Sequence, residues 1–325
     1  MAAITDEPPP LVREDLARLR VALTGAIPRK RTGNLVLASW NIRAFGGLAA
    51  TWMTAPTDSP KRDWHAVQCI AEFVRRFDVV AVQECRADLS ALRALMTVLG
   101  DRWAFIVTDV TKGFAGNDER LAFIFDTKRV QLSGLAAELV VPTDNAPGAI
   151  SEDAFDRQFA RTPYAVSFRR QTSVFVLVSL HVLWGKKPAD RLGELSAIAR
   201  WLADWATEEN DINQNLIVLG DFNIDRLGDP LYEAFVSTGL WPPAELNAVP
   251  RTLYATPTKP HFYDQIAWFT DTTNLTGRLT LNYNRRAGGF DFRPHVLRGM
   301  DNTALSWRLS DHLPLWVELT TSPRS

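Results

Sequence analysis

The chain has 325 residues, with 36 Lys and Arg against 37 Asp and Glu, and a formal net charge of −1. A charge this close to neutral argues against a protein held on nucleic acid or membranes by bulk electrostatics, so any site for a polyanion has to be local. Cys69 and Cys85 lie in apolar or strand-like surroundings, so we expect buried thiols and no disulfide framework.

Residues 1–33 are expected to form an N-terminal extension. After Pro8 to Pro10 the sequence predicts a short helix, followed by a basic turn at residues 28–31. The apolar residues expected on one side of this helix are Leu11, Leu16, Leu19 and Leu23. The extension either packs on the rest of the chain or is mobile. Because no signal peptide and no membrane span is recognisable, we expect a cytoplasmic protein.

The next part of the chain alternates strands with amphipathic helices. Runs rich in β-branched and aromatic residues predict strands, and apolar residues at helical spacing predict helices. The strands are expected at 35–41, 78–84, 103–108 and 119–125. The helices are expected at 64–77 and 88–99, and the glycines between 113 and 116 give slack to the loop before the fourth strand.

The second half predicts further strands around one long helix at 189–207. Residues 140–162 are typical of a loop, and a hairpin is expected from 164–168 and 174–180. Later strands are expected at 215–219, 262–268, 279–283 and 315–319, with short Pro-rich turns between them. Helices that can cover only outer faces predict a four-layer αββα sandwich, in which two mixed β-sheets pack face to face.

Domain organisation follows from what the chain lacks. It has no short-period repeat, no low-complexity block and no convincing linker. Although 325 residues could form two average domains, one large α/β sandwich also reaches this size. We therefore expect one domain at residues 34–320, followed by a tail at 321–325.

The run from Asn215 to Asn223 ends a buried strand in polar groups. Gly220 lets the backbone turn as it leaves the sheet. Asp221 and Asn223, two positions apart, direct their oxygens to one site if the segment is extended. The alternative is an Asx turn, in which Asp221 caps the following segment. The run by itself does not decide between the two.

Five other strand ends also carry polar groups. The six sets are Asn41, Glu84, His181, Asp221 with Asn223, Asp264, and Asp311 with His312. Taken singly, most have a structural explanation as a turn, a cap or a satisfied core histidine. Asp264 is more informative, because a carboxylate inside an apolar strand requires a partner. Together, the carboxylates and amides suit Mg²⁺, and the dispersed His and Cys residues give no zinc spacing. This combination indicates phosphate-ester hydrolysis.

The order of the motifs adds a resemblance. Ser39-Trp40-Asn41-Ile42-Arg43, Gln83-Glu84, Gly220-Asp221-Phe222-Asn223, Tyr263-Asp264 and Ser310-Asp311-His312 resemble the successive signatures of the endonuclease/exonuclease/phosphatase superfamily. The deoxyribonuclease I branch is the most similar, through the segments 41–46, 83–86, 119–120, 161–163, 180–181 and 290–292. Each motif is weak alone, but the ordered series over residues 34–320 is specific.

The resemblance implies roles for individual residues. Glu84, Asn41 and Asp311 resemble the metal-binding set, whereas Asp221 and Asn223 resemble groups that orient the nucleophile and the scissile phosphate. His181 and His312 resemble a paired acid and base, steadied by Glu119 and Asp264 respectively. The substrate contacts implied are Arg43, Arg86 and Arg161. The implied cofactor is Mg²⁺, with Mn²⁺ as a substitute and Ca²⁺ as a structural ion.

Some features depart from that branch or extend it. The secreted members carry a signal peptide and disulfides, and an aromatic residue that meets the nucleic-acid groove is replaced here by Asn117. A basic rim could be extended by Lys186, Lys187, Arg285, Arg286, Arg293 and Arg298, although a solvated surface is the ordinary use of such residues. Trp184, Phe290 and Phe292 either stack on bases or pack in the core.

The leading hypothesis is a Mg²⁺-dependent phosphodiesterase, most simply a DNA endonuclease of low sequence specificity, active as a monomer on nucleic acid. A second hypothesis keeps the chemistry and changes the substrate to an inositol phosphate, a sphingophospholipid or a small nucleotide. A third, of another class, is a catalytically silent binding module on the same fold. The arginines at positions 43 and 86 favour nucleic acid.

Overall fold

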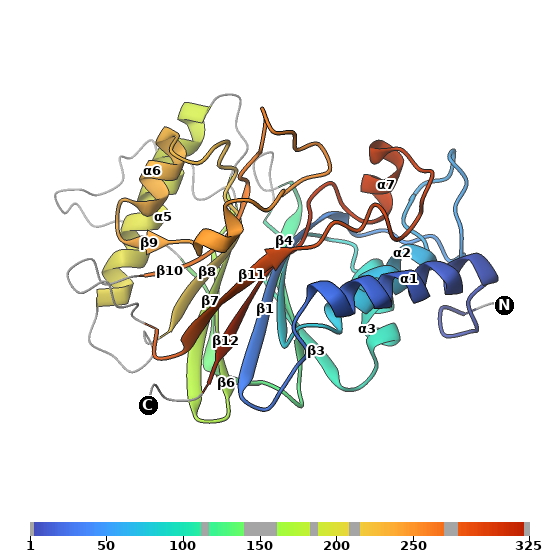
Figure 1. The fold of residues 1–325 in the computed structure, drawn as a ribbon, viewed down its shortest axis with the longest axis horizontal. Helices are drawn as coiled ribbons and strands as arrows, with labels where there is room; N and C mark the ends of the chain where they lie inside the picture. Colours follow the sequence, from blue (N-terminus) through green and yellow to red (C-terminus); the bar gives the residue numbers. More distant parts are fainter. Residues whose placement is uncertain are drawn as a thin grey trace.

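The computed structural model describes residues 3–111, 117–139, 161–182, 188–207, 215–269 and 279–321. Within these residues two six-stranded mixed sheets lie between two groups of helices (Figure 1). This arrangement is the four-layer αββα sandwich expected from the sequence. No helix in the same residues is long and apolar enough to cross a membrane.

The first sheet has the strand order β11-β12-β1-β2-β4-β3, and only β1 and β2 run parallel. Its strands are β1 (Asn34–Phe45), β2 (Val79–Arg86), β3 (Trp103–Val107), β4 (Glu119–Asp126), β11 (Asn282–Gly289) and β12 (Leu315–Thr320). β1 is buried along almost its whole length, because it is covered by helices on one face and by the second sheet on the other.

The second sheet has the order β5-β6-β7-β8-β10-β9, and its parallel pair is β7 with β8. Its strands are β5 (Gln131–Glu138), β6 (Tyr164–Arg170), β7 (Ser173–His181), β8 (Leu216–Asp221), β9 (Leu240–Trp241) and β10 (Asp264–Phe269). Apolar side chains from both sheets, among them Leu37, Phe123 and Leu219, form the core between them.

The helices form the two outer layers and their connections. They are α1 (Pro10–Ala26), α2 (Trp64–Val74), α3 (Ser90–Leu99), α5 (Pro188–Thr207), α6 (Pro230–Val236), α7 (Asn302–Arg308) and the 3₁₀ turn η1 (Ala244–Leu246). α1, α2 and α3 share a core with the first sheet, whereas α5 and α6 share one with the second (Figure 1).

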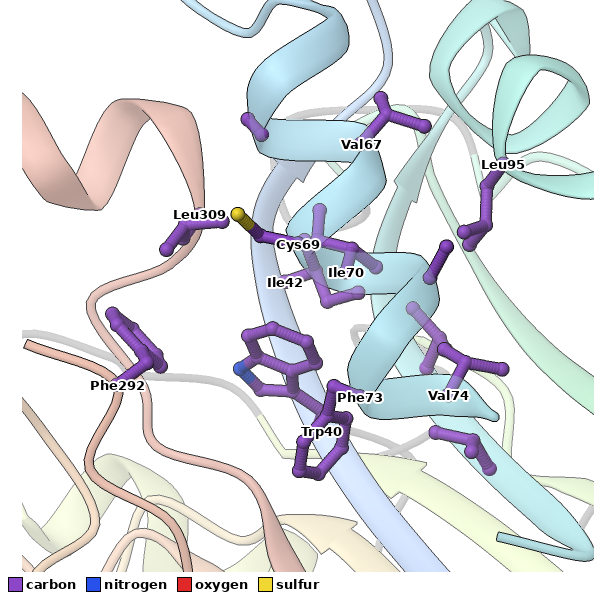
Figure 2. Packing of buried hydrophobic residues seen from close by; sticks show 14 of the residues in the cluster. Trp40, Ile42, Val67, Cys69, Ile70, Phe73, Val74, Leu95, Phe292 and Leu309 are labelled. Atoms are coloured by element: carbon purple, nitrogen blue, oxygen red, sulfur yellow. The ribbon is translucent and has the colours of Figure 1, made fainter. Parts of the chain in front are cut away.

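The N-terminal helix packs on the rest of the chain, which answers the question that the sequence left open. Its buried side is formed by Val12, Leu16, Leu19 and Leu23, at the spacing of one helix face. Leu11 was expected on that side, but it is 53% exposed, because the face begins one residue later. In the core that this helix joins, Trp40 of β1 lies between Phe73 of α2 and Phe292 (Figure 2).

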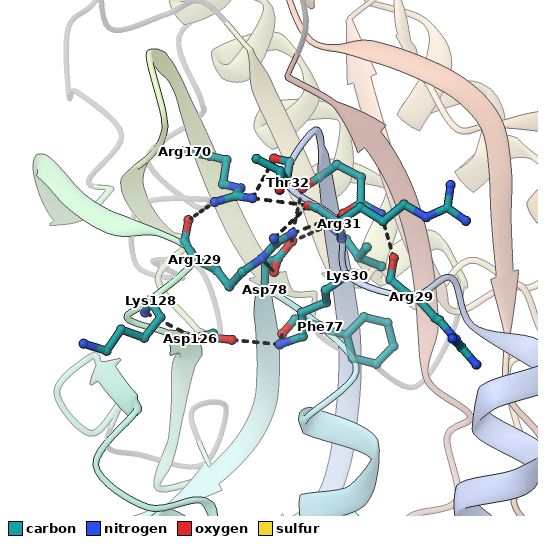
Figure 3. A network of polar contacts seen from close by, with 12 residues as sticks. Arg29, Lys30, Arg31, Thr32, Phe77, Asp78, Asp126, Lys128, Arg129 and Arg170 are labelled. Carbon is teal, nitrogen blue, oxygen red and sulfur yellow. Dashed lines mark hydrogen bonds and ion pairs between the residues drawn. The ribbon is translucent and has the colours of Figure 1, made fainter.

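Charged groups hold the start of β1, at the opposite end of the strand from Asn41. Asp78, fully buried, accepts from the backbone of Val36 and from the guanidinium of Arg129. Asp126 is bound by Lys30 at 2.9 Å (Figure 3). Arg102 binds the same carboxylate. These contacts tie residues 30–34 to the base of the first sheet.

The elements that differ from expectation are short or polar. The sequence patterns do not predict β5, α6, β9 or α7, and they predict a strand at 279–283 where β11 begins only at Asn282. β5 and β11 are sheet edges with alternating or partial exposure, so they carry no continuous apolar run. α6 and α7 have seven residues each, too few to show helical periodicity. The loop expected from 140 onward lies largely outside the described residues.

Candidate active site

The site forms where the ends of the central strands of both sheets meet. In the second sheet, Asp221 at the end of β8 is the register partner of His181 in β7 and of Asp264 in β10. In the first sheet, Asn41 of β1 pairs in register with Gln83, the residue before Glu84. The neighbouring strands therefore bring residues far apart in sequence into one row of polar groups.

Asp221 is the centre of this row and is 2% exposed. Its Oδ2 atom lies 3.6 Å from Nε2 of His181 and 3.8 Å from Nε2 of His312. The same oxygen accepts a hydrogen bond of 3.0 Å from Nδ2 of Asn41, which comes from the other sheet. One carboxylate oxygen therefore faces both histidines.

His312 and Asp264 form a buried pair, as the resemblance implied. Nδ1 of His312 lies 2.6 Å from Oδ2 of Asp264, which is fully buried. Burial alone lowers the pKa of His312, but the charges of Asp264 and Asp221 outweigh it and raise that pKa well above its ordinary value. Burial also raises the pKa of Asp264 to about 6. The two groups share one proton, and we assign it to His312 because several carboxylates act on the imidazole.

His181 contacts Glu119, the second pairing implied by the resemblance. Nδ1 of His181 lies 3.2 Å from Oε2 of Glu119, at ion-pair distance without hydrogen-bond alignment. Arg161 contacts the same oxygen, and Arg86 lies 3.3 Å from the other. Burial works to raise the pKa of Glu119, but His181 and the two arginines lower it to about 2. Glu119 is therefore ionised at neutral pH.

The sequence also proposed a metal site, and part of the donor set fits one. Oδ1 of Asn41 is buried and has no hydrogen-bond partner among the described residues. Glu84 follows in the neighbouring strand with its side chain 18% exposed, and Oε2 accepts from the backbone of Ala44 at 2.8 Å. In the same residues no three His, Cys, Asp or Glu side chains form a metal cage. The donors fit Mg²⁺, which keeps several waters and needs few carboxylates.

Asp311 and the three arginines lie on the margin of the site. Asp311 is 27% exposed and lies 3.7 Å from Nη1 of Arg43. Arg43 and Arg86 are similarly part-exposed, whereas Arg161 is 11% exposed and lies against Glu119. Arg43 and Arg86 are therefore partly accessible at the margin of the site, whereas Arg161 lies against Glu119.

At Asn223 the structure has the second of the two alternatives that the sequence left open. The strand ends at Asp221, and Asn223 has a φ of +52°. Its backbone N–H donates to Oδ1 of Asp221 at 2.9 Å, which is the Asx turn considered as the alternative. Its Nδ2 donates to the carbonyl of Val182 at 2.7 Å. The segment is therefore not extended, and the two side chains do not point to one site. Asp221 makes the turn with Oδ1 and faces the histidines with Oδ2.

Gly220 makes this strand end possible. It has a φ of +142°, and a Cβ there would lie 2.0 Å from the carbonyl oxygen of Leu180. Asn223 at the same strand end also has a positive φ, and so do non-glycine residues at the other ends: Ala44, Glu84, Asn117, Asp118 and His261. Such conformations are costly and persist only where the surroundings impose them, which is typical of functional sites.

Three buried polar residues support the site without having been assigned a role from the sequence. Oγ of Ser310 donates to the carbonyl of Asn41 at 2.6 Å and accepts from the backbone of His312. Gln83 donates to Oγ of Ser179 at 3.1 Å and thereby links the two sheets. Arg251, 1% exposed, donates to the carbonyl of Asp264 at 3.2 Å. In the sequence, Gln83 and Ser310 stand directly before Glu84 and Asp311 in the motifs, but no motif or pattern around Arg251 indicates its role.

The remaining residues considered from the sequence are buried in the core, bonded to Glu119 or outside the described residues. Phe292 is 3% exposed and packs against Trp40 (Figure 2). Phe290 is 5% exposed and packs against Phe73, so both are core residues and not base-stacking ones. Asn117 donates from its amide to Glu119 at 2.7 Å. Trp184, Lys186 and Lys187 lie outside the described residues.

Two curated relatives are deoxyribonucleases. The chain is 29% identical over 212 residues to a deoxyribonuclease of Thioalkalivibrio sp. (strain K90mix), covering 63% of this chain and only half of that relative. It is 24% identical over 302 residues to deoxyribonuclease-1 of Bos taurus, covering 88% and 93% of the two chains.

Solved structures share the fold. The mannosyl-6-phosphatase Bt3783 of Bacteroides thetaiotaomicron superposes with a TM-score of 0.57 at 19% identity, over 88% of this chain and 99% of that one. TDP2 of D. rerio, in complex with a single-strand DNA product, superposes with a TM-score of 0.56 at 13% identity, over 89% and 99%. The sequence model of the Endonuclease/Exonuclease/phosphatase family matches residues 38–312, and the chain therefore belongs to that family.

Proposed function

We propose that this protein is a Mg²⁺-dependent phosphodiesterase that hydrolyses nucleic acid, with DNA as the preferred substrate and little sequence specificity. The observation that carries the proposal is the placement of two histidine Nε2 atoms within 3.6 and 3.8 Å of one oxygen of Asp221. Each histidine is backed by its own buried carboxylate, Glu119 or Asp264. In-line hydrolysis of a phosphodiester needs such a pair, because one proton has to leave the water and another has to reach the leaving oxygen.

The two histidines are suited to different roles. His312 holds a proton at neutral pH, since nearby carboxylates raise its pKa, and it is the group that donates to the leaving oxygen. His181, oriented by Glu119, accepts the proton of the attacking water. Asp221 lies between them and orients that water, while Asn41 fixes the carboxylate through the 3.0 Å hydrogen bond. Asn223 holds the turn that aims Asp221.

The metal and the arginines supply positive charge. Glu84 and the free amide oxygen of Asn41 would hold Mg²⁺, with Asp311 at the margin, and a bound ion would stabilise negative charge on the phosphoryl oxygens. Arg43 and Arg86, both part-exposed, would contact backbone phosphates. Arg161 holds the carboxylate of Glu119, which in turn orients His181. We also propose that residues 34–320 form the catalytic domain and that residues 1–33 are an extension that packs against it.

A second candidate is a phosphatase or phosphodiesterase acting on a small phosphoester. It is favoured by the formal net charge of −1, which offers no bulk attraction to a polyanion. Bt3783, a phosphatase by name, also shares the fold.

A substrate panel separates the two functions. Purified protein is incubated with plasmid DNA, single-stranded DNA, RNA, an inositol phosphate and a sugar phosphate, each with Mg²⁺ and with EDTA. We expect cleavage of DNA that requires Mg²⁺ and is abolished by EDTA. Release of phosphate from the small esters without cleavage of any nucleic acid would reject the nuclease and support the second candidate.

A further inference from the structure

One exposed aromatic residue lies beside the site and is used by neither the core nor the mechanism above. Trp307 of α7 is 42% exposed and stands five residues before His312. The helix is anchored by its buried residues Leu305, Ser306 and Arg308, the last of which donates to the carbonyl of Thr54. Trp307 is therefore not needed to hold the helix in place.

Arg43 connects Trp307 to the site. Its guanidinium lies over the indole, with Cζ 3.8 Å from the ring centroid. The same group donates to Oγ of Ser306 at 2.7 Å and lies 3.7 Å from Oδ2 of Asp311. These contacts fix a cation stacked on an aromatic ring next to the residue that precedes His312.

A second exposed aromatic residue lies on the neighbouring segment. Tyr254 is 45% exposed, and the backbone N–H of Leu253 before it donates to the carbonyl of Asp311 at 2.8 Å. Exposed aromatic rings beside an arginine are the arrangement with which proteins bind single-stranded nucleic acid, because every base offers a π-face. Of the aromatic residues for which the sequence left base stacking or core packing open, Phe290 and Phe292 are buried and Trp184 lies outside the described residues.

We propose that Trp307, backed by Arg43, is a base-stacking subsite that binds an unpaired nucleobase next to the scissile phosphate. This subsite rests on the proposed nuclease function. It refines the substrate class, because stacking on Trp307 requires a base that is not paired in a duplex. The preferred substrates are then single-stranded or frayed DNA.

The test measures binding of a fluorescein-labelled single-stranded DNA 12-mer by fluorescence anisotropy in EDTA. Trp307→Ala should raise Kd about 10-fold, which equals about 1.4 kcal/mol and lies in the range of one stacked base. Trp307→Phe, which keeps a stacking ring, should restore most of the affinity. The matched control is Trp241→Ala, because Trp241 is 50% exposed on β9, which pairs with the far end of β10. A 12-mer of stable abasic residues should bind wild type and Trp307→Ala equally.

The outcomes separate the subsite from the function. Equal binding of the base-bearing 12-mer by wild type and Trp307→Ala overturns the subsite even if the protein cleaves DNA. The subsite is also overturned if Trp307→Ala weakens binding of the abasic 12-mer as much as binding of the base-bearing 12-mer. Trp307 would then affect only the shape of the site. If wild type binds no 12-mer, the subsite falls as well. If the protein cleaves no nucleic acid but Trp307→Ala still weakens binding of the base-bearing strand selectively, the subsite stands and the nuclease proposal fails.

Discussion

Asp264 shows how far a single residue can be interpreted from sequence. A carboxylate inside an apolar strand requires a partner, and the partner is His312, 2.6 Å away. What the sequence could not give is the position of Asp221 between the two histidines. That position depends on the register of β7, β8 and β10, which is a property of the folded sheet.

Removing the charge of Asp264 tests the protonation of His312. The raised pKa of His312 keeps it protonated through neutral pH, so activity that needs this proton is lost as pH rises through the raised pKa. In Asp264→Asn the burial that lowers this pKa remains while the main opposing charge is gone. The alkaline limb of kcat should therefore move to lower pH, with a loss of up to about 10²-fold at pH 8 and a smaller loss at pH 5.5.

The pH profile of kcat is measured beside Asp58→Asn, a change at an exposed loop carboxylate that should leave the profile unaltered. An alkaline limb that stays at the wild-type pH in Asp264→Asn would contradict the assignment of the proton to His312.

Glu84 gives a test of metal binding that does not depend on activity. A ligand at 100 times its Kd adds about 2.7 kcal/mol to the free energy of unfolding. Mg²⁺ should therefore raise the Tm of wild type, and Glu84→Gln should need at least about 10-fold more Mg²⁺ for the same rise. Glu14→Gln, on the exposed side of α1, is the control. A Glu84→Gln protein with the wild-type Mg²⁺ response would remove Glu84 from the metal site.

At the scale of elements, the sequence predicted those that bury a periodic apolar pattern. β1, β2 and β8 have continuous apolar runs, and their boundaries agree with expectation to within a few residues. β5, β11, α6 and α7 were missed or shifted because edge strands and seven-residue helices bury too little to show a period. At Asn223 the sequence left an extended segment and an Asx turn open, and the structure has the turn, with a positive φ.

Gly220 offers a test of the strand end. In Gly220→Ala the new Cβ would meet the carbonyl of Leu180 at 2.0 Å in a conformation that L-residues rarely adopt. We expect a loss of about 2–4 kcal/mol in the free energy of unfolding, or a failure to fold. Gly193→Ala in α5, where a Cβ has open space, should be neutral or stabilising by up to about 1 kcal/mol. Denaturant titrations that give the two variants the same stability would show that the backbone at Gly220 is not constrained.

At the scale of the whole molecule, the site belongs to neither sheet alone. Asn41 and Gln83 of the first sheet reach Asp221 and Ser179 of the second. The ordered motifs could identify the participants, because each ends an apolar run. The sequence could not show which side chains meet across the sandwich, nor that Arg251 supports Asp264 from a segment without a pattern. It left base stacking and core packing open for Phe290 and Phe292, and both lie in the core.

We propose that His181 and His312 act together on a phosphodiester. The most direct test of this proposal is the rate of plasmid DNA cleavage in Mg²⁺ by wild type, His181→Ala, His312→Ala and the control His295→Ala, whose ring stacks on Phe290 in the core. Circular dichroism establishes that each variant is folded. We predict that each of the two site variants cleaves about 10²- to 10⁴-fold more slowly than wild type, and that His295→Ala retains wild-type activity. Wild-type rates in both site variants, or no cleavage by wild type, would contradict the paired roles of His181 and His312.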